Sequence, residues 1–345
     1  MLRRLILFLI ILLTIISIIA GNWLHDAENR VINYEPQIIT VANGTSMRGL
    51  ADQLVSEGLL NEPWSFRIWA RYRGLAGSLK AGEYRLEANT TLQGLLQLVT
   101  SGKVIDYPVT FIEGWNFKQL RMALSTQKKL RHEIDELDDQ AIMQAIEADG
   151  IHPEGRFYPD TYHYTSSMSD LDILRRAYKK MADFLVLEWD QREDGLPLQN
   201  KEQALVLASI IEKETGVADE RPMIAGVFIN RLRKGMRLQT DPTVIYGMGE
   251  NYKGNIRKKD LLTDTPYNTY TRAGLPPTPI AMPGGDSIRA ALHPADTRAL
   301  YFVAKGDGTH HFSTTLTEHN EAVIKYQLKG RRKNFTSYDT SATKK

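Results

Sequence analysis

The 345-residue sequence contains no cysteine, and its charges nearly cancel. The absence of cysteine excludes thiol catalysis, disulfide bonds and thiolate metal sites, and it fits an oxidising compartment only weakly. Lysine and arginine together number 43, aspartate and glutamate number 41, and the net charge is +2. Because the basic residues are dispersed and no nucleic-acid-binding fingerprint is present, we expect no nucleic-acid partner.

Two other kinds of site lack the patterns that they require. The glycines of 247–254 are not followed by the start of a helix, so they do not form a dinucleotide-binding fingerprint. His310, His311 and His319 do not have the spacing of an established metal site. We therefore expect neither a cofactor nor a bound metal ion.

The long hydrophobic run of this chain lies at its N-terminus. Two arginines at 3–4 precede an uncharged stretch at 5–20, and Trp23 follows at the position of an interfacial anchor. Cleavage by a signal peptidase after Ala20 would place Ile18 at position −3, where a small residue is required, so we favour an uncleaved membrane anchor over a cleaved signal. The arginines place the short tip in the cytoplasm and everything after the anchor outside it.

The chain after the anchor divides into a small module and a larger domain. The module alternates short strands with helices, which we predict near 38–41, 46–58, 63–73, 82–86 and 90–102. It resembles the LysM-like domains that bind glycan chains in cell-wall proteins, and a spacer without a ligand of its own is the alternative. We predict an α+β fold with the following parts: a cytoplasmic tip and transmembrane anchor (1–24), a LysM-like module (25–104), a mixed α/β domain (105–329) and a disordered tail (330–345).

One predicted helix of the larger domain carries a carboxylate in an unusual position. Asn200 is a good N-cap for this helix, and Gly216 is placed as the C′ glycine that ends it. On a helical wheel, Glu214 continues the apolar stripe of 207–211. Glu212 points roughly 160° away from Glu214, so we expect Glu212 to be solvated and Glu214 to face inward.

An inward position changes the chemistry of Glu214. Desolvation by apolar neighbours disfavours its ionised form, and the unpaired carbonyls of the last helical turn act in the same direction, so both raise its pKa. A carboxylic acid that stays protonated near neutral pH can act as the general acid at a glycosidic oxygen. The alternative is a structural role, in which Glu214 binds a buried backbone or arginine partner.

A second helix and a polar segment follow. Asp219 is a good N-cap for this helix, and Gly235 closes it. The next polar residues are Gln239, Thr240 and Asp241. Because Asp241 precedes a proline, we expect an extended or turn conformation there, which lets these side chains face the same cleft as Glu214.

The stretch 265–280 is rich in proline and glycine, and tyrosines and amides such as Asn268 and Tyr270 lie among them. Such a composition cannot form regular secondary structure, so we expect a rigid loop wall of a polysaccharide cleft. Side chains of these types bind either one another or the hydroxyl and acetamido groups of sugars. A β-hairpin is predicted further on, from strands at 300–304 and 310–313.

Several motifs together resemble those of one family, the YceG-like (MltG-type) endolytic murein transglycosylases of bacterial inner membranes. These motifs are Glu154–Tyr162 (EGRFYPDTY), Ile211–Gly216 (IEKETG), Phe228–Leu232 (FINRL), Met236–Gly249 (MRLQTDPTVIYGMG), Tyr267–Tyr270 (YNTY) and Gly274–Pro277 (GLPP). The resemblance covers nearly the whole chain and is weakest at 121–149. The anchor and the LysM-like module occur in the order expected for the family.

The resemblance implies a site and a reaction. It makes Glu214, on its helix, the catalytic acid, in agreement with the helical wheel. The residues that it implies for substrate binding are Asn230, Gln239, Thr240, Asp241, Tyr246, Asn268 and Tyr270. The implied reaction cleaves the bond between N-acetylmuramic acid and N-acetylglucosamine and forms a 1,6-anhydro end, which would terminate nascent glycan strands.

The resemblance also implies a location and partners. The substrate would be peptidoglycan glycan strands, and the chain would be held in the inner membrane by residues 5–20, with its catalytic domain on the extracytoplasmic side. Peptidoglycan synthases of the elongation or division machinery are the implied protein partners. Two other functions stay open: a lysozyme-like muramidase that uses Glu214 with Asp241, and a non-catalytic cell-wall scaffold.

Overall fold

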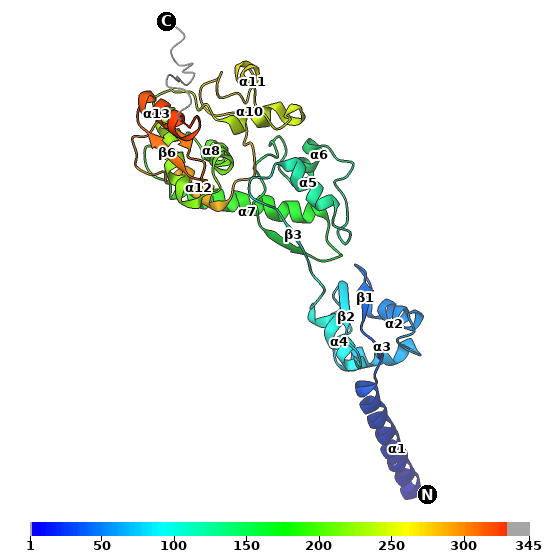
Figure 1. The fold of residues 1–345 in the computed structure, drawn as a ribbon. Coiled ribbons are helices and arrows are strands. Elements are labelled where there is room, and N and C mark those ends of the chain that lie inside the picture. The colour runs from blue at the N-terminus through cyan, green and yellow to red at the C-terminus, as the bar shows by residue number, and fades with distance from the viewer. Residues whose placement is uncertain (1, 330–345) are drawn as a thin grey trace. The chain divides into compact units, whose positions relative to one another are not determined.

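The computed structural model describes residues 2–329 (Figure 1), and the predicted disordered tail at 330–345 lies outside them. The helices are α1 (Leu2–Asn29), α2 (Met47–Ser56), α3 (Pro63–Tyr72), α4 (Leu92–Ser101), α5 (Phe117–Ser125), α6 (Asp139–Ala145), α7 (Asp170–Asp190), α8 (Lys201–Glu214), η1 (Ala218–Glu220), α9 (Arg221–Arg233), α10 (Asp241–Met248), η2 (Gly249–Asn251), α11 (Lys258–Leu262), α12 (Gly285–Leu292) and α13 (Leu316–Tyr326). The strands are β1 (Gln37–Val41), β2 (Gly82–Leu86), β3 (Tyr107–Thr110), β4 (Thr161–Tyr164), β5 (Tyr301–Ala304) and β6 (His310–Ser313).

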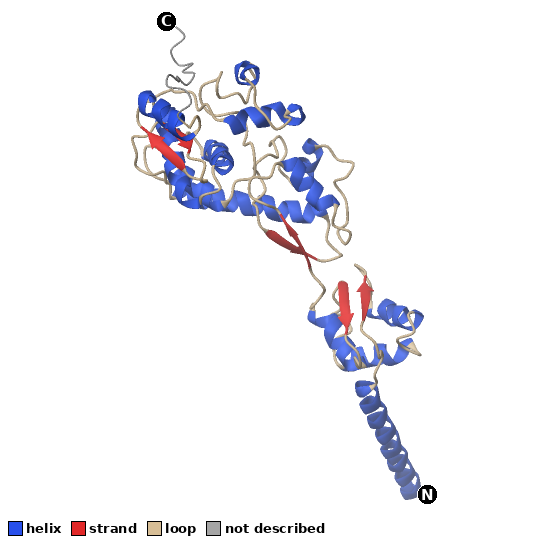
Figure 2. Cartoon of the chain, in the orientation of Figure 1, coloured by secondary structure: helices blue, strands red, loops and turns tan. Residues whose placement is uncertain are grey.

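Helices dominate this fold, as the blue ribbons of Figure 2 show. Within the described residues, the strands form two-stranded sheets, β1 with β2, β3 with β4 and β5 with β6. This mixed content is consistent with the predicted α+β class. The chain forms two compact units, an N-terminal unit (Met1–Pro108 with Lys129–Arg131 and His163–Ser169) and a C-terminal unit made of the remaining segments.

The N-terminal unit has its own hydrophobic core. β1 runs antiparallel to β2, with Ile39 opposite Tyr84. Ser46 caps α2 and Thr91 caps α4, because each side chain accepts a hydrogen bond from a backbone N–H in the first turn. The strands and helices bury a common set of side chains, which includes Ile39, Leu50, Leu54, Phe66, Trp69, Tyr84 and Leu95. The predicted strand and helix positions of this region are confirmed to within a few residues.

α1 is long and apolar enough to cross a membrane. Its candidate span, Arg3–Asp26, has 24 residues and a mean hydropathy of 2.8, and its most apolar window is not buried in the protein. At ~1.5 Å per residue such a helix reaches about 36 Å, more than the ~30 Å hydrocarbon layer. A signal sequence meets the same criterion, so the uncleaved anchor stays a prediction.

The C-terminal unit is built around α8. Every residue from Ala204 to Ile211 is buried, because α7, α9, α10 and α12 pack around this helix. The apolar partners from the other elements include Leu185, Ile224, Phe228, Ile288 and Leu292. A helix that is covered on nearly all sides leaves few of its side chains in contact with water, and this decides the environment of its acidic residues.

The ends of α8 and α9 agree with the sequence-based predictions only in part. Asn200 caps α8 as predicted, since its side chain accepts the Gln203 N–H at 3.0 Å. The expected C′ role of Gly216 is wrong: α8 ends at Glu214, and the C-cap that follows, Thr215, has an extended backbone (φ −144°) that needs no left-handed glycine after it. The predicted N-cap Asp219 is also wrong, because it lies inside η1 and α9 starts directly after η1. Gly235, at φ +64°, does close α9.

The segment after α9 is more regular than the sequence predicts. Asp241 begins α10 instead of a turn, while the residue before it, Thr240, is extended (φ −114°) and serves as the N-cap. A proline is tolerated at this point because the first N–H groups of a helix have no intrahelical partner. The stretch 263–284 forms no helix or strand, as expected. β5 and β6 form the predicted antiparallel hairpin, with Phe302 opposite Phe312.

Candidate active site

Glu214 is the last residue of α8 and lies where this helix emerges from the core. Leu207, Ile210 and Ile211 are 0% exposed, but the whole of this helix from Ala204 to Ile211 is buried, so their burial does not single out one inward face. The side chain of Glu214 is partly buried and faces a cavity of about 510 Å³. A cavity of this size can take part of a sugar chain.

The surroundings of Glu214 favour its protonated form. Burial is the largest cause, and together with the charge of Asp241 it raises the pKa of Glu214 from 4.5 to about 7. The Thr240 hydroxyl, which donates a hydrogen bond to Oε1, and the Arg231 guanidinium oppose this effect without cancelling it. The carboxyl group can therefore both hold and release a proton near neutral pH.

Four of the predicted substrate-binding residues line the same cavity: Gln239, Thr240, Asp241 and Tyr270. The Tyr270 hydroxyl donates a hydrogen bond to Asp241 Oδ1 at 2.6 Å. Burial and the charge of Asp241 raise the pKa of Tyr270 far above its usual range, so this hydroxyl remains a donor. Thr240 is fixed through its backbone, since its N–H donates to the Thr269 hydroxyl at 3.1 Å.

Three predicted substrate-binding residues do not line the cavity. Asn230 donates to two backbone carbonyls of the loop before β5, at 2.7 and 3.2 Å. Tyr246 donates its hydroxyl to Glu154 Oε2 at 3.1 Å. Asn268 is 1% exposed and its amide nitrogen donates to carbonyls within 260–263, at 2.7 to 3.3 Å. These three side chains hold loops in place, so a direct contact with substrate is a prediction that the geometry does not favour.

The prediction of a solvated Glu212 is wrong, because its side chain is only 6% exposed. Its Oε2 accepts hydrogen bonds from the Gly284 N–H at 3.0 Å and from the Ser287 hydroxyl at 2.7 Å. Its Oε1 lies 3.5 Å from the Arg221 guanidinium. Glu212 therefore accepts hydrogen bonds from the N-terminal end of α12, and α12 packs on this side of α8. A helical wheel gives the direction of a side chain and not the element that covers it.

The sequence and fold of this chain match proteins that are already known. The model of the YceG-like family matches residues 39–325. The chain belongs to this family. A crystal structure of a YceG-like protein from Listeria monocytogenes superposes with a TM-score of 0.52 at 32% sequence identity, and the match covers 83% of this chain and 98% of that one.

Two curated relatives are named for an activity. A protein from Bacillus subtilis called "Endolytic murein transglycosylase" is 35% identical over 305 residues, which are 84% of this chain and 84% of that protein. A protein of the same name from Streptococcus pneumoniae strain R6 is 25% identical over 325 residues, 84% of this chain and 58% of the relative. The similarity to the Bacillus protein therefore extends over most of both chains.

Arg231, near the end of α9, is a buried residue of the site that the sequence analysis did not single out. Its Nε donates to the Leu300 carbonyl at 2.6 Å, and its NH1 donates to the Leu238 carbonyl at 2.8 Å. Its guanidinium also lies 5.1 Å from the centre of the Tyr301 ring. Arg231 thus ties the segment before Gln239 to the residue that precedes β5, and it places a positive charge near Glu214.

Besides the residues near Glu214, the cavity is lined by the β5–β6 hairpin and α13. Its members include Tyr301, Phe302, His310, Leu316 and His319. The His319 ring stacks on the Tyr301 ring at 5.2 Å. Burial lowers the pKa of His319, so its ring is neutral near pH 7. The sequence analysis considered His310 and His319 only as metal ligands. Nothing in the sequence around them predicts that they line a cavity.

Glu154 is a second buried acid that the sequence analysis did not single out, although it begins the EGRFYPDTY motif. It is 4% exposed. Its oxygens accept the Phe117 N–H at 3.1 and 3.3 Å and the Tyr246 hydroxyl at 3.1 Å. Burial raises the pKa of Glu154 to about 7. Glu154 connects the start of α5 to α10, the helix that begins with Asp241.

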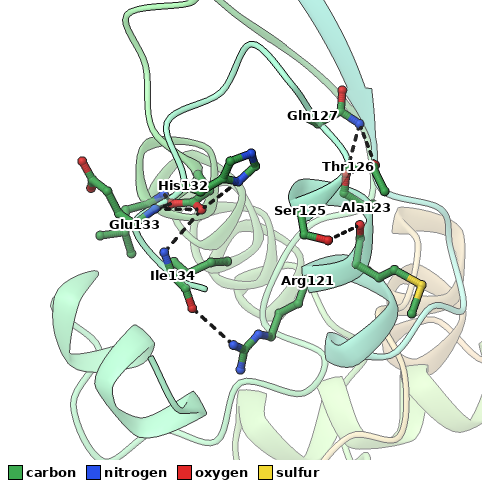
Figure 3. Close-up of polar contacts among 11 residues, drawn as sticks. Arg121, Ala123, Ser125, Thr126, Gln127, His132, Glu133 and Ile134 are labelled. Carbon is green, nitrogen blue, oxygen red and sulfur yellow. Dashed lines mark hydrogen bonds and ion pairs between the residues drawn. The ribbon is translucent and has the colours of Figure 1, made fainter. Parts of the chain in front are cut away.

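A cluster of His132, Asp135 and Asp170 brings its ligand-type atoms within 4.8 Å of one another. Asp170 is fully buried and accepts the N–H groups of Glu133 and Ile134, at 3.0 to 3.4 Å. Figure 3 shows this loop, with Arg121 donating to the Ile134 carbonyl at 3.3 Å. Because the backbone of the loop already occupies the Asp170 oxygens, the cluster is explained by its role in holding the loop.

Proposed function

We propose that this protein is an endolytic murein transglycosylase that cleaves peptidoglycan glycan strands. The observation that carries the proposal is the Glu214 carboxyl, which faces the cavity with its pKa raised to about 7. General acid catalysis is most efficient when the pKa of the acid is near the working pH. The name of the Bacillus subtilis relative supports the same reaction class and the same substrate.

In the proposed reaction, Glu214 acts first as an acid and then as a base. Its proton passes to the oxygen that joins N-acetylmuramic acid to N-acetylglucosamine, and the bond from this oxygen to muramic C1 breaks. The carboxylate then accepts the proton of the muramic 6-hydroxyl, whose oxygen bonds to C1 and forms the 1,6-anhydro ring. No water is consumed, and Glu214 recovers its proton.

The contacts of Glu214 suit both roles. The Thr240 hydroxyl binds Oε1, which leaves Oε2 to carry the transferable proton. The hydrogen bond from Thr240 also stabilises the carboxylate after the first step, since it lowers the pKa of Glu214.

The role of Asp241 differs between the two candidate enzymatic functions. A muramidase would use its carboxylate as a second catalytic group. Here Asp241 accepts the Tyr270 hydroxyl at 2.6 Å, a contact that suits a residue which orients sugar hydroxyls or stabilises the positive charge of an oxocarbenium-like transition state. We therefore assign Asp241 and Tyr270, with Gln239 and Thr240, to substrate binding.

The test is a digest of purified peptidoglycan with the full-length protein, followed by mass analysis of the products. A transglycosylase yields 1,6-anhydro-muramic ends, whereas a muramidase yields reducing muramic ends that are heavier by one water. Internal cleavage predicts products of many lengths instead of the steady release of disaccharides. Undigested glycan with retained binding would support the scaffold alternative, and Glu214→Gln is the matched inactive control.

We further propose that α1 is an uncleaved anchor in the bacterial inner membrane and that residues 25–104 form a LysM-like, glycan-binding module. The apolar span Arg3–Asp26 and the two arginines at its start support a single pass with the C-terminus outside the cytoplasm. In this position the enzyme can terminate strands as neighbouring peptidoglycan synthases elongate them. A C-terminal reporter that is active only outside the cytoplasm tests the topology, and a mature chain that begins near Gly21 would contradict the anchor.

A further inference from the structure

α3 of the N-terminal unit carries an unusual exposed face. Its buried side, with Phe66 and Trp69, packs into the core. On the opposite side, Trp64, Ile68 and Tyr72 are 47%, 49% and 64% exposed. These three residues are spaced by four, so they lie on one face of the helix, and we name them the α3 stripe. Large side chains that are exposed in a row on one helix mark an interaction surface.

The α3 stripe is continuous with the end of the apolar helix α1, which lies next to α3 in Figure 1. The rings of Trp23 and Trp64 stack with their centres 5.5 Å apart and 18° between their planes. Trp23 belongs to the candidate membrane span and also packs against the core of the N-terminal unit. Whatever depth Trp23 has in a membrane, Trp64 must have nearly the same depth.

The connection between α1 and the rest of this unit is fixed by several hydrogen bonds. Arg30 forms ion pairs with Glu62, at 3.1 Å, and with Asp26, at 3.3 Å. The Leu92 N–H donates to the Arg30 carbonyl at 2.9 Å, and the next residues also pair with the segment before α4. A flexible linker would let the unit move away from the membrane, but these bonds hold it at the end of α1.

The charges beside the α3 stripe are basic. Arg67 and Arg71 are exposed on the same side of α3, while the nearby acids Asp26 and Glu62 are already paired with Arg30. Tryptophan and tyrosine concentrate at the level of the lipid headgroups, and helices that lie in this layer combine such residues with arginine or lysine. Basic side chains near the surface are attracted by anionic lipids.

We propose that the α3 stripe binds the surface of the lipid bilayer that α1 crosses, with Arg67 and Arg71 on anionic headgroups. This inference rests on the proposed anchor. It adds a second attachment point beside α1, which sets the orientation of the N-terminal unit on the membrane. The unit then cannot turn freely about the anchor.

The absence of cysteine allows a clean test with single-cysteine variants of the full-length protein. Each variant receives an environment-sensitive fluorophore and is reconstituted in vesicles of phosphatidylcholine and phosphatidylglycerol, with and without lipids that carry a quencher. Ile68→Cys reports the α3 stripe. Ile19→Cys, in the span, is the control for insertion, and Asp52→Cys, exposed on α2, is the control for a site in water. We expect quenching at positions 19 and 68 and none at position 52.

The outcomes separate the stripe from the anchor. Quenching at position 19 with none at position 68 would overturn the stripe proposal and leave the anchor intact. Absence of quenching at both positions would overturn both. A blue-shifted signal at position 68 that lipid quenchers do not reduce would show that a second copy or another protein covers the stripe, which also overturns the proposal.

A charge test distinguishes headgroup binding from general insertion. In the background of Ile68→Cys, the double change Arg67→Glu and Arg71→Glu should reduce quenching at position 68, and the same change should leave position 19 unaffected. Vesicles of phosphatidylcholine alone should reduce quenching at position 68 in the same way. Equal quenching with and without anionic lipid would overturn the assignment of the two arginines.

Discussion

Replacement of Glu214 by glutamine should remove activity and, at alkaline pH, increase stability. Burial raises the pKa of Glu214 from 4.5 to about 7, so the folded state holds this proton more tightly than the unfolded state. The stabilising effect of the proton is complete below pH ~4.5 and is lost as the pH rises through about 7. Above pH 7 the wild-type protein must therefore keep an ionised carboxylate in a poorly solvated position.

The size of the effect follows from the same values. A change of pKa from 4.5 to about 7 corresponds to roughly 3 kcal/mol, at about 1.4 kcal/mol for each tenfold change in the proton equilibrium. Glutamine has the same shape, does not titrate, and can still accept the Thr240 hydrogen bond. The difference in unfolding free energy between the variant and the wild type should therefore grow by roughly 2–3 kcal/mol from pH 5 to pH 8, in favour of the variant.

The assay combines stability with turnover. Urea unfolding at pH 5 and pH 8 measures the free energy of unfolding of wild-type and Glu214→Gln proteins, and release of 1,6-anhydro products measures activity, which should fall by at least ~10². Glu212→Gln is the control on the same helix. It loses the ionic part of its bonds to Gly284, Ser287 and Arg221, so it should lose about 1–3 kcal/mol of stability and keep its specific activity within a few-fold.

Three results would refute this reasoning. An active Glu214→Gln protein would exclude this residue as the acid, whatever the stability data show. A glutamine variant whose advantage over the wild type does not grow with pH would show that the environment of Glu214 does not favour its protonated form. Loss of activity in Glu212→Gln with its fold intact would assign the catalytic role to Glu212 instead of Glu214.

Three further predictions concern residues that the sequence analysis assigned to substrate binding. Asp241→Asn removes a charge that raises the pKa of Glu214, so the alkaline limb of the pH–activity profile should move to lower pH; Tyr270→Phe keeps that charge and should not move it. Asn268→Ala removes the buried amide that donates to the carbonyls of Asp260, Leu261 and Thr263, so thermal unfolding should show a loss of about 1–3 kcal/mol with specific activity preserved; a stable but inactive variant would return Asn268 to substrate binding. Tyr246→Phe removes a hydrogen bond to Glu154 and should cost about 1–2 kcal/mol in urea unfolding, and an unchanged midpoint would contradict the connecting role of Glu154.

Local features of the fold could be predicted because they depend on neighbours in sequence. The N-cap of α8 at Asn200 is one such feature, because its side chain binds the backbone of the first turn of the same helix. Helical periodicity gave the direction of the Glu214 side chain relative to its neighbours on α8, whereas the cavity that it faces is formed by other segments. The apolar span of α1 was likewise evident from composition.

Tertiary structure decided the features that depend on segments distant in the chain. Glu212 became buried because α12, about 70 residues later, covers that side of α8. The amides of Asn230 and Asn268 have the same chemistry as the cavity residues, but backbone carbonyls of folded loops occupy them. Their role could not be read from residue type.

The candidate site shows the same division. The sequence alone determined that one helix ends in an inward carboxylate and that polar residues follow the next helix. Only the folded chain brought Asp241 and Tyr270 together across 29 positions, added Arg231 and the hairpin wall, and buried Glu214 enough to raise its pKa. The burial and the hydrogen-bond partners of a side chain depend on which distant segments pack against it. The local sequence of a helix does not determine which segments these are.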